Sequence, residues 1–285
     1  MLRNGYKIVF FIALISGIPL YCQFSTPIAP ADTHEYFNYA RIIRQHGCQI
    51  RKDHNYIVQG GNVTNDEYTS RIIKYSTKGF IQEITYLDKS SQKLSVISFQ
   101  YKNGLPYRET EFLTNGEVVG HTVYTYDSLG FLKEKVNYDQ FDYVIYKLVY
   151  ETDTMNNVIV LKQFYSPGNI SKTYIYTYSD LICGRLQSII EYDGEAFFKY
   201  RKEFAYNSEN LLEKEIILDI NNNTEYLLER FYDANGMLEK IDRVLAGEER
   251  FPWYNSQYSA EGLLLGEIKY SSRGNIISYF KYSYY

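Results

Sequence analysis

The stretch TYDSLGFLKEK, residues 125–135, decides the fold, and RFYDANGMLEK, residues 230–240, repeats its pattern later in the chain. In both stretches a Tyr–Asp pair leads into a Gly, and a Leu follows two residues after that Gly. A tight turn between antiparallel strands needs positive φ, which Gly adopts freely. Each phrase therefore predicts a turn with a new strand beginning at the Leu.

Copies of this phrase run through most of the chain, which identifies a repeat protein. A second turn follows each phrase, as in FLTNGEV at residues 112–118 and YDGEAF at residues 192–197. Each unit is thus expected to hold two strands and two turns, giving about sixteen strands of up to ~9 residues. Eight Tyr residues, spaced by 24 to 28 positions, mark the copies: Tyr75, Tyr101, Tyr126, Tyr150, Tyr178, Tyr206, Tyr232 and Tyr258.

The expected strands alternate between apolar and polar residues. Leu132 and Val136 fall on one face, and Lys133 and Lys135 fall on the other. Alternation of this kind indicates a half-buried antiparallel sheet with one apolar face and one wet face. About sixteen strands exceed what open sheets hold without curling. We therefore expect an all-β fold of tandem antiparallel β-hairpin repeats that forms a long curled sheet or shell.

The segment before the repeats has a different character. Residues 31–47, ADTHEYFNYARIIRQHG, lack the repeat and offer Asp32 or Thr33 as a helix start and Gly47 as a stop. They predict a short helix that covers the open edge of the first strand. The expected organisation is a signal peptide at 1–22, an N-terminal cap segment at 23–70 and a YD-like β-hairpin repeat domain at 71–285.

The first residues have the pattern of an export signal. Arg3 and Lys7 precede an uncharged run from Ile8 to Gln23, shorter than the ~20 residues of a membrane span. Cleavage is expected after Cys22, which places the protein in the periplasm, on the cell surface or outside the cell. A membrane contact is expected only if Cys22 carries a lipid or the signal stays uncleaved.

Two further cysteines, Cys48 and Cys183, remain after that cleavage. In an exported chain they are a candidate disulfide. Two buried free thiols are the alternative, because separation in sequence says nothing about distance in space.

The phrases YDSLGFL and YDANGML resemble the YD repeats of bacterial Rhs-type proteins, and the resemblance extends over about residues 70–285. Residues 101–120, YKNGLPYRETEFLTNGEVVG, also resemble MORN-variant hairpin repeats. The resemblance implies a β-strand shell in a cell-surface or secreted setting. Large members of the family wrap a toxic C-terminal domain. We expect no such role here, because no room for that domain follows the repeats.

Polar residues with metal-binding or catalytic potential are few. We expect no catalytic, cofactor-binding or metal-ligating residue. Asp219, Asn221 and Asn223 alternate as at the start of a calcium loop, but Thr224 stands where the loop needs Gly, so a polar hairpin turn is expected. The histidines, expected to be solvated or structural, are His34, His46, His54 and His121.

Paired carboxylates are the other feature with catalytic potential. Glu213 and Glu215 are paired carboxylates, the residue type that a glycosidase uses. The alternation of the strand places both on its wet face, where a structural role is expected.

The composition limits the partners. The chain has a net charge of −4 and so lacks the excess of positive charge that nucleic-acid binding needs. The chain has 32 Tyr and 16 Phe, and rings left exposed can stack on sugars or anchor a protein. We expect an exported, non-enzymatic repeat protein that serves as a binding or structural scaffold for a protein or glycan partner, with no cofactor. The alternatives are an outer-membrane β-barrel and a hydrolase with a dispersed site.

Overall fold

The structure is a computed structural model that describes residues 41–153, 157–165, 168–178, 185–245 and 249–285. These residues divide between two compact units. Unit 1 contains Asn55–Glu67 and Tyr200–Tyr282, and unit 2 contains 41–54, Tyr68–Lys199 and Ser283–Tyr285. The expected signal peptide and Cys22 lie outside the described residues.

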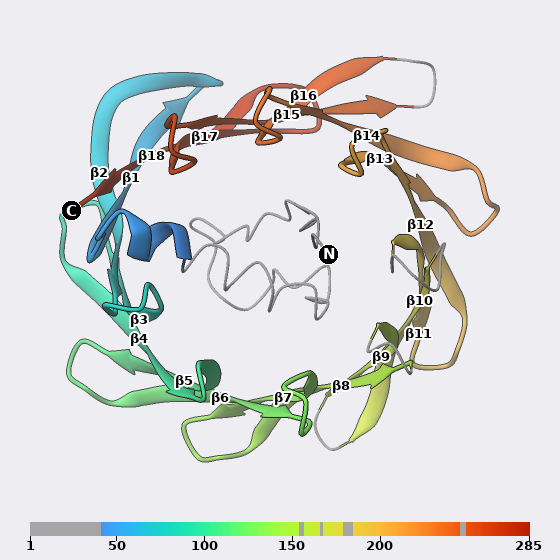
Figure 1. Cartoon of the computed structure of the whole chain (residues 1–285), viewed down its shortest axis with the longest axis horizontal. Helices are drawn as coiled ribbons and strands as arrows, with labels where there is room; N and C mark the ends of the chain where they lie inside the picture. The colour runs from blue at the N-terminus through green and yellow to red at the C-terminus, as the bar shows by residue number, and fades with distance from the viewer. Residues whose placement is uncertain (1–40, 154–156, 166–167, 179–184, 246–248) are drawn as a thin grey trace, which may run out of the picture. The chain divides into compact units, whose positions relative to one another are not determined.

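Strands make up most of the described chain (Figure 1). The first nine are β1 (Ile50–Gln59), β2 (Asn62–Tyr75), β3 (Ile81–Leu87), β4 (Lys93–Lys102), β5 (Leu105–Leu113), β6 (Val118–Tyr126), β7 (Leu132–Asp139), β8 (Val144–Thr152) and β9 (Val158–Tyr165). The others are β10 (Asn169–Tyr178), β11 (Leu186–Asp193), β12 (Phe198–Tyr206), β13 (Leu212–Leu218), β14 (Thr224–Tyr232), β15 (Leu238–Leu245), β16 (Arg250–Tyr258), β17 (Leu264–Tyr270) and β18 (Ile276–Tyr284).

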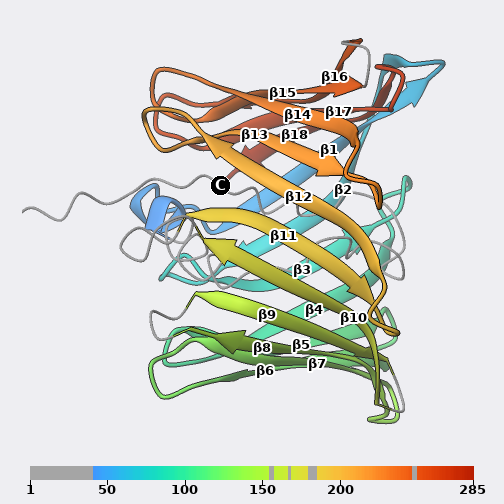
Figure 2. The same cartoon turned by 90° about the vertical axis from the view of Figure 1, so that its right-hand side faces the viewer.

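The hydrogen-bonding order of these 18 strands closes on itself. Within each unit, Figures 1 and 2 show strands that are neighbours along the chain lying side by side. Each strand pairs with the next one along the chain, and β1 pairs with both β2 and β18. The N–H groups of Gln49 and Ile50 donate to the carbonyl oxygen of Tyr285, at 2.7 and 3.0 Å, and Tyr285 N–H donates to Ile50 at 2.8 Å. The prediction of hairpin repeats is confirmed, but the open curled sheet is wrong. The topology is that of a closed antiparallel β-barrel.

Two strands from the expected cap segment make this closure possible. The repeats supply β3 to β18, and β1 with most of β2 comes from the residues before them. Only residues 41–45 are helical in the described part of 31–47. Because β1 is hydrogen-bonded on both sides, it has no open edge for a helix to cover. The helical edge cap is therefore not supported.

The Asp and Gly of the repeated phrase build its turn. After β6, Oδ1 of Asp127 accepts hydrogen bonds from the N–H groups of Leu129 and Phe131, both at 2.9 Å. Gly130 N–H donates to the Asp127 carbonyl at 3.1 Å, and Gly130 has a φ of 89°. The strand register shifts just before this turn, at Tyr126. The same cap recurs at Asp88, Asp139, Asp193, Asp219 and Asp233, and with Asn207 in that place.

In four of the eight copies, the Tyr of the phrase ties its turn to the neighbouring strand. Its hydroxyl donates to a backbone carbonyl twenty residues earlier in the chain. This contact lies within unit 2 for three copies and within unit 1 for the fourth. The hydroxyl group of this tyrosine thus explains why Tyr, rather than another aromatic residue, precedes the turn. The four pairs are Tyr101 with Ile81 at 2.6 Å, Tyr126 with Pro106 at 2.8 Å, Tyr178 with Val158 at 2.8 Å and Tyr232 with Leu212 at 2.6 Å.

The two faces of the sheet are less different than the alternation predicts. In unit 2, register places Val136 opposite Val123 on one face and Lys135 opposite Tyr124 on the other. Lys135 is only 8% exposed, and its ammonium lies 5.2 Å from the Tyr124 ring centroid. The Tyr124 hydroxyl donates to Glu109 at 2.6 Å. The prediction of a wet face is wrong here, because aromatic rings and paired charges cover the polar groups.

Candidate functional site

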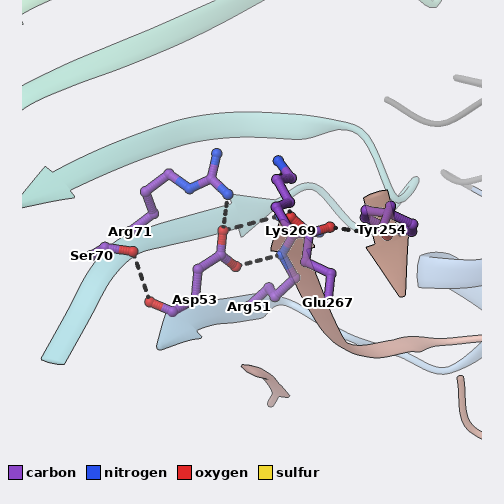
Figure 3. A network of polar contacts seen from close by, with 7 residues as sticks. All are labelled: Arg51, Asp53, Ser70, Arg71, Tyr254, Glu267 and Lys269. Atoms are coloured by element: carbon purple, nitrogen blue, oxygen red, sulfur yellow. Dashed lines mark hydrogen bonds and ion pairs between the residues drawn. The ribbon is translucent and has the colours of Figure 1, made fainter. Parts of the chain in front are cut away.

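A buried charged cluster joins β1 to β2 within unit 2 (Figure 3). Asp53 is fully buried, and Arg51 donates to its Oδ1 at 2.8 Å. Arg71 reaches its Oδ2 at 2.6 Å, and the Ser70 hydroxyl donates to the Asp53 carbonyl at 3.2 Å. Both carboxylate oxygens are therefore engaged by cations. This arrangement stabilises the pairing of the N-terminal strands and offers no free acid or base.

A second buried cluster lies in unit 1 and corrects an expectation. Glu215 on β13 was expected on the wet face but is only 8% exposed. Lys202 on β12 contacts its Oε1 at 3.0 Å, and Arg230 on β14 contacts its Oε2 at 2.7 Å. The two flanking cations offset the cost of burying the carboxylate. Glu213 remains exposed, so the two acids are not an equivalent catalytic pair.

An open pocket of ≈ 660 Å³ in unit 2 is our first candidate for binding a ligand among the described residues. It exists where a short turn adjoins a longer one. The β4–β5 turn has two residues, Asn103 and Gly104, with φ of 55° and 81°, whereas five residues connect β2 to β3. The shorter turn leaves space beside its neighbour. The pocket is lined by Ser76, Lys78, Phe80, Gln82, Phe99, Tyr101, Asn103 and Gly104.

Aromatic rings form a fixed wall of this pocket. Phe80 stacks on Tyr101 with ring centroids 5.3 Å apart and an interplanar angle of 21°. The Tyr101 hydroxyl is held by its hydrogen bond to Ile81, so this ring is positioned by the fold. Phe99 precedes Tyr101 by two residues on β4 and lines the same pocket. The wall is preorganised for an apolar surface of a ligand.

An exposed apolar row, our second candidate surface, runs along five successive hairpin ends of unit 2. Its members lie at or beside the turns that follow β3, β5, β7, β9 and β11. Large apolar side chains at consecutive turns are more than the scattered exposure of ordinary surfaces. The row comprises Leu94, Leu113, Phe141, Tyr143, Tyr165 and Phe197, which are 44 to 70% exposed.

The structure places most of the residues singled out in the sequence. His54 contacts Ser283 at 3.1 Å, and His121 stacks on Tyr138 with centroids 4.7 Å apart. His46 follows the short helical segment, and His34 is outside the described residues. Across the described ranges, no three His, Cys, Asp or Glu side chains are grouped to hold a metal ion.

The other polar predictions concern a turn and a pair of cysteines. Asp219 accepts the N–H groups of Asn221 and Asn223, both at 2.8 Å, so the expected polar hairpin turn is confirmed. Cys48 is buried. Cys183 lies outside the described residues, and the disulfide stays a prediction. Within the part of the chain that the structure describes, no helix has the length and apolarity to cross a membrane.

Sequence reasoning missed the pocket, although one signal pointed to it. Asn103–Gly104 is the dipeptide that favours a two-residue hairpin turn, and most other copies have a longer capped turn. The change in turn length was visible in the sequence. The register of β3 and β4 decides which aromatic rings border the resulting space, and the sequence alone does not give that register.

No family model matches this sequence, and no curated protein matches it. Among solved structures, a porin-like protein from Bacteroides uniformis has a TM-score of 0.45 at 9% identity, covering 84% of this chain and 98% of that one. A porin-like protein from Bacteroides vulgatus has a TM-score of 0.39 at 12% identity, covering 82% and 97%. A Tc holotoxin pore of Photorhabdus luminescens has a TM-score of 0.38 at 14% identity, covering 78% of this chain and 15% of that one.

Proposed function

We propose that this chain is an exported, non-enzymatic β-barrel of the outer membrane, the function first considered as an alternative to a scaffold. The observation that carries the proposal is the closed strand order, with β1 paired to both β2 and β18. A closed sheet satisfies every backbone hydrogen bond without a free edge, which is the condition for strands to cross a bilayer. Even numbers of antiparallel strands are the rule in bacterial barrels.

Two further features support the proposal. Most strands have 7 to 10 residues, close to the ~9–11 that a tilted strand needs to cross a membrane. The exposed apolar row in unit 2 includes Phe141 at 69% and Tyr143 at 70% exposure. Aromatic side chains at strand ends suit the boundary between lipid and water.

The outer-membrane proposal requires that charged side chains within the strands face water. Lys147 pairs with Glu134, and Lys162 pairs with Glu151 at 2.6 Å, in the β7–β9 region of unit 2. These side chains are partly exposed and need water. In a membrane barrel the face that bears them would have to line an aqueous lumen.

A second function, a water-soluble exported barrel that acts as a binding scaffold, is favoured by charges on the opposite face. Strand register places Lys135 and Glu191 there, and Glu191 pairs with Lys172 at 2.8 Å. A charged side chain facing lipid at mid-membrane costs about 2–4 kcal/mol for Lys or Arg. Charge on both faces therefore favours water on both sides of the sheet.

Fractionation of the native protein separates the two functions. An outer-membrane barrel is expected to need detergent for extraction and to change gel mobility on heating. A soluble barrel is expected in the periplasmic or external fraction without detergent, which would overturn the membrane proposal. Replacing Phe141 with Glu provides a second measurement, because it should reduce insertion into vesicles while leaving a soluble barrel unaffected.

The chain is also proposed to be a relative of the YD-repeat proteins. The distinct roles of the Tyr, Asp and Gly in its turns support this assignment. The test is whether the turns in an experimental structure of a YD-repeat protein show the same contacts of the tyrosine hydroxyl and the aspartate carboxylate.

A further inference from the structure

We propose that the pocket beside the Asn103–Gly104 turn binds a short oligosaccharide and prefers one whose sugars carry a carboxylate. The pocket's volume of ≈ 660 Å³ falls within the ~300–1,000 Å³ of typical ligand sites. It lies wholly within unit 2. The proposal goes beyond the barrel function and applies to a membrane-embedded or a soluble barrel alike.

The aromatic wall provides the first argument. One face of a pyranose ring presents mainly C–H groups, which carry slight positive charge. The face of an aromatic ring is negative because of its quadrupole, so the two surfaces attract and exclude water together. Phe80 and Tyr101 are half-buried and already stacked, and Phe99 adds a third ring. Little side-chain entropy would be lost on binding.

The polar lining provides the second argument. Gln82 and Asn103 are exposed side chains with both donor and acceptor atoms, which match sugar hydroxyl groups that also donate and accept. Lys78 is exposed and is the sole charged residue among those that line the pocket. With no lining acid to oppose it, the ammonium favours an anionic sugar over a neutral one.

The short turn keeps the pocket open. A five-residue capped turn ending in a large apolar residue, as at Asp127–Phe131, occupies the corresponding place in another repeat. The two-residue turn replaces it with Asn103 and Gly104 and leaves the rings accessible. The site is thus a property of one repeat and not of the repeat in general.

Calorimetric titration of the full chain with trigalacturonic acid and with galactotriose tests the proposal, since the two probes differ in their carboxylates. We expect the acidic trisaccharide to bind about tenfold more tightly than the neutral one. The Lys78→Gln variant should remove that difference. No detectable binding of either probe in the millimolar range, or equal binding of both by the unmodified protein, would overturn the proposal.

Three variants keep the test independent of folding. Phe80→Leu removes a ring but retains the apolar residue found at the equivalent turn positions Leu211 and Leu263, so binding should weaken while the unfolding midpoint changes little. Asn103→Gly keeps the positive φ and removes the amide, and should also weaken binding. Replacing Asn103–Gly104 with the turn sequence DSLGF should abolish binding by filling the space. Unchanged binding in all three would refute the pocket as the site.

Discussion

The hydroxyl of Tyr126, at the end of β6, donates a 2.8 Å hydrogen bond to the carbonyl oxygen of Pro106, near the start of β5. Tyr126 immediately precedes Asp127, whose carboxylate holds the following turn. The two side chains act in different directions: the Asp closes its own turn, and the Tyr joins that turn to the adjacent strand. The repeated Tyr–Asp pair is therefore a device for aligning consecutive hairpins.

Removing one such hydroxyl tests its contribution to stability. Tyr126→Phe deletes the donor and leaves the Pro106 carbonyl without this partner, so the free energy of unfolding should fall by about 1 kcal/mol. Urea denaturation measures the change. Tyr143→Phe is the matched control, since Tyr143 is 70% exposed and should show a change below about 0.5 kcal/mol. Equal effects of the two substitutions would show that the hydrogen bond has no special role.

The next prediction compares Asp, Asn and Ala at the first position of a turn. Asp233 accepts the N–H groups of Asn235 and Met237, both at 2.8 Å. Asp233→Ala leaves both donors without this acceptor and should lower the free energy of unfolding by about 1–2 kcal/mol. Asp233→Asn should restore most of the loss, because Asn207 makes the same contacts in another turn. An Asn variant as unstable as the Ala variant would contradict the cap.

Acid should weaken the turn that Asp219 holds. The backbone N–H of Asn223, followed by that of Asn221, lowers the pKa of the Asp219 carboxyl from its ordinary value. Because the folded pKa is depressed, this stabilisation is present above the unfolded pKa of about 3.9 and is lost as pH falls through the folded value. Unfolding midpoints of the unmodified protein and of Asp219→Asn, measured from neutral pH to pH ~2, should converge at low pH. A constant difference would contradict this account.

The sequence predicts local structure well because each turn is encoded locally. Gly130 and Asp127 mark a turn whether or not the neighbouring hairpin is known. Closure depends instead on Ile50, from the segment before the repeats, meeting Tyr285, the last residue described. A pattern of spacing contains no information about that contact.

The wrong predictions of side-chain exposure have a related cause. Alternation assigned Lys135 and Glu215 to a wet face because it counts polarity along one strand. Their burial depends on partners from adjacent strands: the Tyr124 ring for Lys135, and Lys202 with Arg230 for Glu215. Predicting those partners requires the strand register.

Closure itself is open to a direct test at Ile50. Ile50→Pro removes the N–H that donates to Tyr285 at 3.0 Å, so the pairing of β1 with β18 should weaken and open two strand edges more often. Light scattering should then detect aggregation on refolding. Ile50→Ala keeps the backbone donor and should refold without it. If the Pro variant also stays monodisperse with an unchanged unfolding midpoint, this pairing does not close the sheet.

Loss of the Glu215 carboxylate should be strongly destabilising. Removing the carboxylate with Glu215→Ala leaves Lys202 and Arg230, whose side chains are 15% exposed, without their anion, which should cost about 3 kcal/mol in urea denaturation. Glu213→Ala, on the same strand but exposed, should change stability by less than about 0.5 kcal/mol.

A triple variant separates the effect of the charges in this cluster on stability from the effect of its packing. Changing Glu215, Lys202 and Arg230 together to Met removes the buried charges while keeping apolar volume, and should recover most of the stability lost by Glu215→Ala. Recovery would mean that the single variant fails because of unpaired cations. If the triple variant is as unstable as Glu215→Ala, the ion pairs themselves hold β12, β13 and β14 in register, and the cluster is needed for its directional contacts.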